Sequence, residues 1–295
     1  MALTSVASLV SGTETVSERT FRVAPLEGDH ILVPLLAADA TVVTDQIRVA
    51  ASLARTSSAS LHVVTPHGGP DRTAPRDGEE LTGTDECALA RWATKQMLAS
   101  TPGGEFGHTR ELVSGIRNCV ETNDVDAMVV PSGSVAGRFR RSVIERLAIR
   151  ADCDVITING SHGYEEMPSM LLAVADGPHS RLATEIARRI AVDCDAWIDI
   201  LHVVSEHASD PRRERASACV ETAARHVDRP ESTTTWILES EDTAGAIAEQ
   251  SAYYGLTIIG APTKGRLQQL VFGSTNKDIR SGARSVVLSA RQGSL

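Results

Sequence analysis

The chain lacks the features that mark membrane, secreted and metal-binding proteins. None of its apolar runs approaches the length of about 18 residues that a membrane-spanning helix needs, so the sequence predicts no membrane insertion. Residues 1–28 hold no basic segment followed by a continuous apolar stretch, which argues against a secretory signal. The five cysteines are widely spaced and form no Cys-x-x-Cys pair, so neither a common zinc site nor a dithiol motif is expected. Together these absences predict a cytoplasmic protein.

Lysine is scarce and acidic residues are in excess. Only three of the 29 basic residues are lysines, Lys95, Lys264 and Lys277, and the net charge is −9. An acidic balance offers duplex nucleic acid no general attraction, so no nucleic-acid partner is expected. The same composition is typical of proteins from high-salt habitats, such as those of haloarchaea, and also of GC-rich genomes. We favour the first because strongly hydrated acidic surfaces keep a protein soluble where salt screens its charges.

A short apolar pattern occurs twice. Leu61-His62-Val63-Val64 recurs as Leu201-His202-Val203-Val204, and each copy follows an apolar run and a segment with the three- and four-residue apolar spacing of a helix. The elements expected downstream of each copy also follow the same order. We therefore interpret the chain as a tandem repeat. It has a leader at 1–28, which we expect to be disordered, a first domain at 29–160, a linker at 161–168 and a second domain at 169–291.

Each copy is expected to be a doubly wound α/β domain with a five-stranded parallel sheet, because strands and helices alternate along it. Strands are predicted at 31–36, 61–64, 107–113, 127–130 and 154–158, and again at 170–175, 201–204, 233–239, 256–259 and 285–289. Helices are predicted at 42–54, 85–99 and 115–122, and again at 180–191, 211–227 and 243–253, with Ser114 and Asp242 as candidate N-caps. Exposed strand edges favour pairing, so the two sheets should meet at their closing strands.

The loop after the strand at 256–259 predicts a phosphate site. The strand runs directly into Gly260, and Gly273-Ser274 follows before a polar segment typical of a helix. Glycines let backbone N–H groups approach an anion closely, because no Cβ stands in the way. A helix N-terminus adds partial positive charge from its unpaired amides. The segment therefore favours binding of phosphate groups.

This loop and the order of the elements resemble the universal stress protein family, whose domains have an adenine nucleotide alpha hydrolase-like fold. Nucleotide-binding members carry Gly, two residues, Gly, nine residues, then Gly and Ser or Thr. Here Thr263 replaces the second glycine, and Gly265 lies two residues later. The segment 175–180 is similar to the family's Asp-Gly-Ser segment, whose Asp lies near the base of bound ATP. The resemblance implies that the second domain binds ATP, with magnesium. The implied nucleotide-binding residues are Asp176, Gly260, Thr263, Gly265, Gly273, Ser274 and Thr275.

The first copy departs further from the family pattern. Its first strand ends without an acidic residue, in Val33-Pro34-Leu35, and Pro131 stands where the second copy has Gly260. Arg141-Ser142 occupies the place of the Gly-Ser pair. The first domain is therefore expected to be a degenerate copy without an ATP pocket. The chain thus pairs a degenerate copy with one closer to the family pattern, as do the paired stress-protein domains associated with membrane transporters. The opening segment Ile31–Leu35 is also similar to those domains.

Signatures of catalysis are missing from the sequence. It has no GxxxxGK[ST] phosphate loop, no HExxH metal pair and no GxSxG nucleophile elbow at a strand end. We therefore expect no enzyme, with at most weak ATP hydrolysis. His62 and His202 are expected to be neutral, hydrogen-bonded core residues. Trp92, Trp197 and Trp236 are expected to pack in the core.

Three functions are open at this point. The first is a stress-response sensor or adaptor that binds an adenine nucleotide in its second domain and thereby shifts a surface facing a protein partner or a second copy of itself. The alternative is a nucleotide-independent interaction or regulatory module, for example of a membrane transporter. An enzyme acting on nucleotides is the third, and the missing signatures disfavour it.

Overall fold

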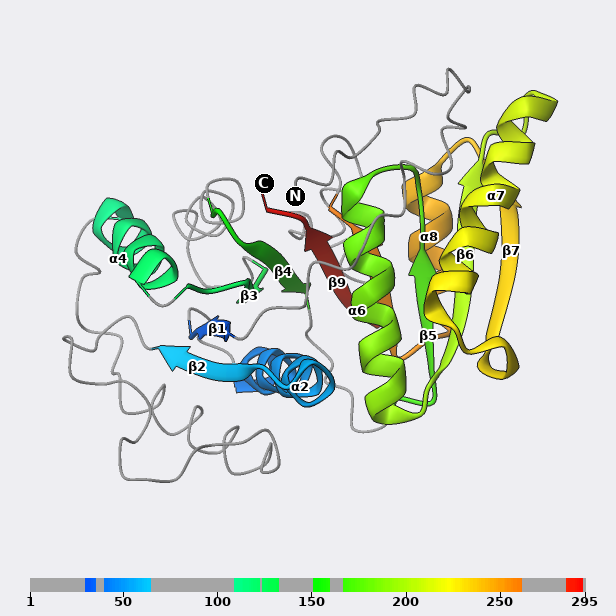
Figure 1. The fold of residues 1–295 in the computed structure, drawn as a ribbon. Coiled ribbons are helices and arrows are strands. Elements are labelled where there is room, and N and C mark those ends of the chain that lie inside the picture. The colour runs from blue at the N-terminus through cyan, green and yellow to red at the C-terminus, as the bar shows by residue number, and fades with distance from the viewer. Residues whose placement is uncertain are drawn as a thin grey trace, which may run out of the picture.

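Nine strands form one continuous sheet in the computed structural model, which describes residues 30–35, 40–64, 109–122, 124–132, 151–159, 167–261 and 285–293. The strand order is β2-β1-β3-β4-β9-β8-β5-β6-β7 (Figure 1). The strands are β1 (His30–Pro34), β2 (Ser60–Val64), β3 (Ala127–Pro131), β4 (Asp154–Asn159), β5 (Ser169–Ala173), β6 (Trp197–Val204), β7 (Thr233–Glu239), β8 (Leu256–Gly260) and β9 (Val286–Arg291). Neighbours pair in parallel except β4 and β9, which are antiparallel. The α/β class is confirmed, in a single mostly parallel sheet.

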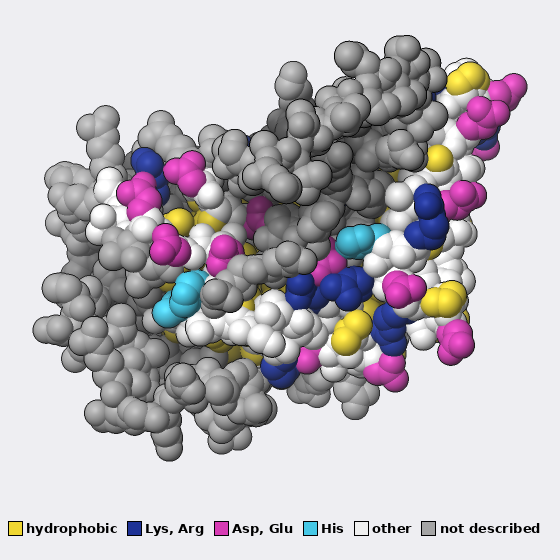
Figure 2. Space-filling model, viewed as in Figure 1, with side chains coloured by type: hydrophobic (Ala, Val, Ile, Leu, Met, Phe, Trp, Pro, Cys, Tyr) yellow, Lys and Arg dark blue, Asp and Glu magenta, His cyan; other side chains and the backbone are white. Residues whose placement is uncertain are grey.

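Helices cover both faces of this sheet. They are α2 (Ala40–Ser57), α4 (Thr109–Thr122), α6 (Pro178–Cys194), α7 (Asp210–Val227) and α8 (Thr243–Ser251), with a short 3-10 turn, η1 (Pro230–Ser232). Figure 1 shows α6 and α7 on one side of strands β5 and β6, and α8 on the other. Basic and acidic side chains intermingle on the α6 and α7 face (Figure 2). None of the helices in the described ranges combines the length and apolar character that a bilayer span requires.

The central strands are buried on both faces, as their continuous apolar runs predict. In β3, Val129 belongs to the core cluster under α2 and α6, whereas Met128 belongs to the cluster under α4. In β8, Ile258 and Ile259 divide in the same way between the α6 face and the α8 face. Alternate side chains of each of these strands therefore contribute to the core on opposite faces of the sheet. A shift of one residue in pairing would exchange the two faces, so this pattern fixes the register.

The two halves of the chain meet at their closing strands, as expected from the sequence. Strand β4 pairs antiparallel with β9, with Ile156 opposite Ala290. The helices α2 and α6 pack beside this junction, where Arg55 Nε donates to Asp193 Oδ1 at 2.7 Å. The predicted meeting of the closing strands is confirmed. The domain boundaries stay predictions, and the leader 1–28, the helix at 85–99 and most of the linker lie outside the described residues.

The predicted strand at 107–113 is wrong, because residues from Thr109 onwards form the first turns of α4. In the sequence, Val113, Ile116 and Val120 recur at helical spacing, and the latter two are buried in the cluster that also contains Met128. Ser114 accordingly lies inside the helix and does not cap it. The described residues of the first half hold four strands, not the five that we expected from the correspondence with the second half.

The expectation that Trp197 packs in the core is also wrong. Its side chain is 40% exposed at the start of β6, where its Nε1 donates to Asp199 Oδ1 at 3.1 Å. Trp236 is partly buried against the cluster under α8. Trp92 lies outside the described residues. An indole at the first residue of a strand sits at the rim of the sheet, where an N–H group finds a polar partner easily.

Asp154, at the start of β4, is predicted to make stability depend on pH. Its Oδ1 accepts the Gly293 N–H at 2.9 Å, while its buried Oδ2 has no hydrogen-bond partner among the described residues. Burial raises the pKa of Asp154 to about 6, against the lowering effect of the Gly293 hydrogen bond and with help from the charge of Asp126. The folded protein therefore holds a proton that the unfolded chain releases. The free energy of unfolding should fall by roughly 2 to 3 kcal/mol as pH rises from about 4 to 6.

Replacing Asp154 by Asn should remove this decline, because the side chain no longer ionises. Urea unfolding at pH 4 and pH 7 measures it for the wild type and the variant. Asp152→Asn changes an exposed carboxylate two residues away and should keep the wild-type pH profile. Identical profiles for Asp154→Asn and the wild type would contradict the assignment to Asp154.

Candidate functional site

A cleft of about 310 Å³ opens at the carboxyl ends of β5 and β6. The cleft lies beside a topological switch point of the sheet. Strand β5 has β6 on one side and β8 on the other, so the strand order reverses direction at β5. Open parallel sheets bind ligands at such switch points. The cleft is lined by Asp176, His202, Val203, Val204, Ser205, Ala208, Arg212, Arg215 and Ala216.

Asp176 reaches the mouth of the cleft because the chain turns sharply between β5 and α6. Ala175 N–H donates to the Ser180 hydroxyl at 2.8 Å, which ties the turn to the first turn of the helix. Gly177 is the N-cap residue of α6 and has a φ of 122°, a conformation that side-chain-bearing residues rarely adopt. Pro178 then opens the helix, where its missing N–H costs nothing. The Asp-Gly-Pro sequence thus fixes an exposed carboxylate at the strand end.

His202 projects from β6 into the floor of the cleft. Burial lowers the pKa of His202 and outweighs the opposing effects of the Asp176 charge and a backbone hydrogen bond with Val174. Its Nδ1 is buried and has no hydrogen-bond partner among the described residues. The imidazole is therefore neutral near pH 7, in keeping with the sequence-based expectation.

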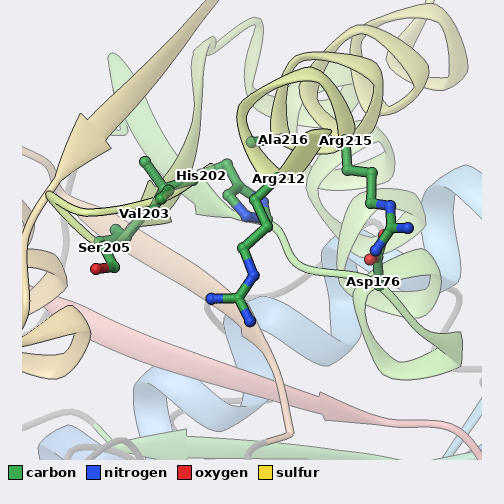
Figure 3. Close-up of a pocket in the computed structure, with 9 residues that line it drawn as sticks. Asp176, His202, Val203, Ser205, Arg212, Arg215 and Ala216 are labelled. Atoms are coloured by element: carbon green, nitrogen blue, oxygen red, sulfur yellow. The ribbon is translucent and has the colours of Figure 1, made fainter. Parts of the chain in front are cut away.

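The start of α7 forms the opposite wall of the cleft. Figure 3 shows Arg212 extending from α7 into the cleft and Arg215 extending toward Asp176. Arg213 has a different role, because it pairs with Glu239 and donates to the carbonyl oxygens of Ala208 at 3.2 Å and Glu206 at 3.1 Å. These bonds hold the segment between β6 and α7 in place. Arg213 therefore holds the segment that forms the cleft wall, whereas Arg212 and Arg215 give this wall its positive charge.

Gly260 ends β8 at the same edge of the sheet as Asp176. A Cβ at this position would lie 2.8 Å from the backbone N of Ser180 and 2.9 Å from the carbonyl carbon of His179. The first turn of α6 therefore packs directly on the Gly260 backbone. This close packing accounts for glycine at the strand end without reference to a ligand, and it brings the start of the predicted phosphate loop beside the α6 N-terminus.

The structure places only two residues of the predicted site, and their role as nucleotide ligands stays a prediction. Asp176 lines the cleft, and Gly260 lies at the same sheet edge without lining it. Thr263, Gly265, Gly273, Ser274 and Thr275 lie outside the described residues. Ser205, Arg212 and Arg215 also line the cleft but were not predicted from the sequence, and His202 was predicted to be a core residue. The run Pro211-Arg-Arg-Glu-Arg215 at a helix start was the available signal, because it places cations beside a strand end.

The corresponding edge of the first half is arranged differently. Strand β1 ends in Pro34, and the Gln46 side chain of α2 donates to the Pro34 carbonyl at 2.9 Å and to the Val129 carbonyl at 2.7 Å. A buried amide thus bridges β1 and β3 at this point. The expectation that the first copy lacks an ATP pocket stays a prediction, because residues 36–39 and 133–150 beside this edge lie outside the described residues.

No protein-family model matches the chain. It is similar to universal stress proteins of Mycobacterium tuberculosis and Mycobacterium bovis, with 26% identity over 190 residues. That match covers 59% of this chain and 64% of each relative, so the chain spans less than two thirds of the length of these curated relatives.

Two solved structures share the fold. A universal stress protein from Archaeoglobus fulgidus has a TM-score of 0.51 at 12% identity and covers 90% of this chain and 96% of its own. The cytoplasmic domain of a prokaryotic cation chloride cotransporter has a TM-score of 0.54 at 12% identity, over 88% of this chain and 94% of its own. The chain is thus similar in sequence to universal stress proteins, and it shares the fold of a solved member of that family.

Proposed function

We propose that the chain is a stress-response sensor or adaptor of universal stress type, and that its second half binds an adenine nucleotide in the cleft between β5, β6 and α7. The observation that carries the proposal is the exposed carboxylate of Asp176 at a switch point, over a cleft of about 310 Å³. Sites for small molecules have volumes of about 300 to 1,000 Å³, so this cleft is large enough for part of a nucleotide.

The chemistry of the lining suits a nucleoside. The Asp176 carboxylate accepts hydrogen bonds from ribose hydroxyl groups, and apolar walls from Val203 and Ala216 suit the faces of a base. Among the described residues no group of three or more His, Cys, Asp or Glu side chains is placed to hold a metal ion, so magnesium would arrive with the nucleotide phosphates.

Binding would act through a change in the surface that faces a partner. We propose that this surface has two conformations in equilibrium. A ligand shifts that equilibrium only by the difference between its affinities for the two conformations, so it must make contacts in the cleft that exist in one conformation alone. The segment between β6 and α7 lines the cleft through Ser205 and Ala208, so a bound ligand would contact it. We propose a cytoplasmic location and at most weak ATP hydrolysis.

The proposal predicts that Asp176→Asn weakens ATP binding by about ten- to a hundredfold, the value of hydrogen bonds to a charged acceptor. The measurement is calorimetric titration of the full chain with ATP and magnesium at high salt. Asp210→Asn is the matched control, because Asp210 is exposed at the start of α7 and does not line the cleft. Absence of ATP binding in a folded wild type would refute the proposed nucleotide function.

The likeness to a cotransporter domain favours a second candidate function, a nucleotide-independent regulatory module of a membrane transporter. Its test is cosedimentation of the full chain with membrane vesicles from its own organism, with and without ATP. Binding to vesicles that neither ATP nor Asp176→Asn changes would support this function over the first. A chain that stays in the supernatant under both conditions would argue against it.

A further inference from the structure

Two arginines on the wall of the cleft form no ion pair with any described residue, although Arg215 extends toward the Asp176 carboxylate. Arg212 and Arg215 lie one helical turn apart on α7 and both line the cleft. Figure 3 shows the Arg212 side chain extending from α7 and the Arg215 guanidinium beside Asp176. Among the described residues, neither guanidinium has a hydrogen-bond or ion-pair partner. Their charges are thus available to a ligand.

Other arginines in and after α7 are engaged. Arg213 pairs with Glu239, and Arg225 donates to the Thr222 hydroxyl at 3.0 Å. Arg229 pairs with Asp195 at 2.6 Å and donates to two carbonyl oxygens. The residues without partners are those that face the cleft.

The charge balance in the cleft favours an anion. The lining holds two arginines against the single carboxylate of Asp176, and His202 adds no charge because burial lowers its pKa. Asp210 and Glu214, the acidic residues nearest in α7, are exposed and do not line the cleft. A guanidinium presents a rigid fork of donors that matches the oxygens of a phosphate.

We propose that Arg212 and Arg215 bind the phosphate of a nucleoside monophosphate, so that this group lies against α7 and not at the loop after β8. The inference rests on the proposed nucleotide function and states where the phosphate goes. Strand β5 separates β6 from β8, and adjacent strands are about 4.8 Å apart, so β6 and β8 are roughly 10 Å from each other. A single phosphate group held by the two arginines is therefore not expected to contact Gly260 at the end of β8 as well.

Titration of the full chain with adenosine and with AMP separates these places. The wild type should bind AMP at least about tenfold more tightly than adenosine, because charge-assisted hydrogen bonds hold the phosphate. Arg212→Gln and Arg215→Gln should each lower AMP affinity about tenfold and leave adenosine affinity unchanged. Arg225→Gln removes one charge from the same helix outside the cleft, and it should change neither affinity by more than about twofold.

The possible results of these titrations distinguish the arginine pair from other positions of the phosphate. Loss of the AMP preference in the two cleft variants alone supports the arginine pair. If AMP and adenosine bind the wild type and the cleft variants keep the AMP preference, the phosphate lies elsewhere, and the inference fails while the nucleotide function stands. If neither ligand binds to the folded wild type, the nucleotide function and this inference fail together.

Discussion

Replacement of Glu185 by Gln should lower the free energy of unfolding by about 3 to 5 kcal/mol, the cost of removing one partner from a buried ion pair. The Glu185 side chain is 1% exposed on α6, where its Oε1 lies 2.6 Å from Arg189 Nε and 2.7 Å from Arg188 Nη2. Its Oε2 lies 2.9 Å from His226 Nε2 of α7. The variant leaves these basic groups beside a neutral amide in a buried position.

The effect should reach beyond α6. Arg189 Nη1 also donates to the Thr56 carbonyl at 2.9 Å, at the end of α2 in the other half of the chain. Glu185 therefore orients the arginine that ties the two halves together beside the β4–β9 junction. We expect Glu185→Gln to loosen the contact between α2 and α6, which hydrogen exchange of the α2 amides would detect.

The destabilisation should depend on pH in a defined direction. Burial alone raises the pKa of Glu185, but hydrogen bonds from His226 and Arg188 and the charges of Arg189 and Arg188 outweigh it and lower the pKa to about 2. A carboxylate with a lowered pKa stabilises the fold above its ordinary pKa and loses that contribution as pH falls toward the folded value. The difference between wild type and variant should therefore be full at pH 7 and shrink below about pH 4.5.

Urea unfolding at pH 7 and pH 3 measures this dependence. Glu121→Gln is the control, because Glu121 pairs with Arg117 at 3.3 Å on the exposed side of α4. Exposed pairs of this kind contribute about 0.3 to 0.5 kcal/mol. Equal losses in the two variants would contradict the assigned role of Glu185.

Most elements of the second half could be predicted from the sequence because their signals are local. Strand β7 spans Thr233–Glu239 as predicted, and α8 begins after Asp242, whose Oδ1 accepts the Gly245 N–H at 3.1 Å. Buried parallel strands give continuous apolar runs, and capping residues mark helix starts. Where both signals are present, the element and its boundary follow from a few adjacent residues.

The predicted strand at 107–113 in the first half was wrong because a local signal was overridden. The strand at 107–113 was inferred from correspondence with β7, although the local spacing of Ile116 and Val120 continues a helix that begins at Thr109. A short apolar run fits both periods. A correspondence between two segments of a chain is therefore a weaker guide to secondary structure than the local spacing of apolar residues.

The cleft was harder to predict because residues from separate elements build it. Asp176 was predicted because residues 175–180 are similar to the Asp-Gly-Ser segment of universal stress proteins. The placing of Arg212 and Arg215 depends on the rotation of α7 about its axis, and the sequence near the helix does not determine this rotation. The Arg55–Asp193 pair likewise joins residues from the two halves of the chain. Such contacts depend on how whole elements pack against one another, and the residues near each contact in the sequence do not determine that packing.

Replacement of Gly260 by Ala should cost about 2 to 3 kcal/mol of stability, near the upper range for overpacking, because the new methyl group meets backbone and not a movable side chain. The nearest atoms are the N of Ser180 at 2.8 Å, the C of His179 at 2.9 Å and the Cα of Ser180 at 3.1 Å. To accommodate the methyl group, the first turn of α6 must move away from β8. That turn also holds Ala175 through the Ser180 hydroxyl, so the position of Asp176 would change with it.

Gly115→Ala provides a control in which the same substitution has the opposite sign. Gly115 lies within α4, and a Cβ there would have no neighbour within 4 Å. Alanine in an exposed helix position stabilises by about 0.5 to 1 kcal/mol relative to glycine. Thermal unfolding of the two variants should therefore shift in opposite directions from the wild type.

Stability and nucleotide affinity measured together distinguish two reasons for glycine at residue 260. If the residue serves the packing of α6 on β8, Gly260→Ala lowers stability with or without nucleotide, and any loss of affinity follows from displacement of Asp176. If it serves only the approach of a ligand to the backbone, the variant keeps wild-type stability and loses affinity. The backbone contacts to Ser180 and His179 favour the first outcome, and unchanged unfolding of Gly260→Ala would overturn it.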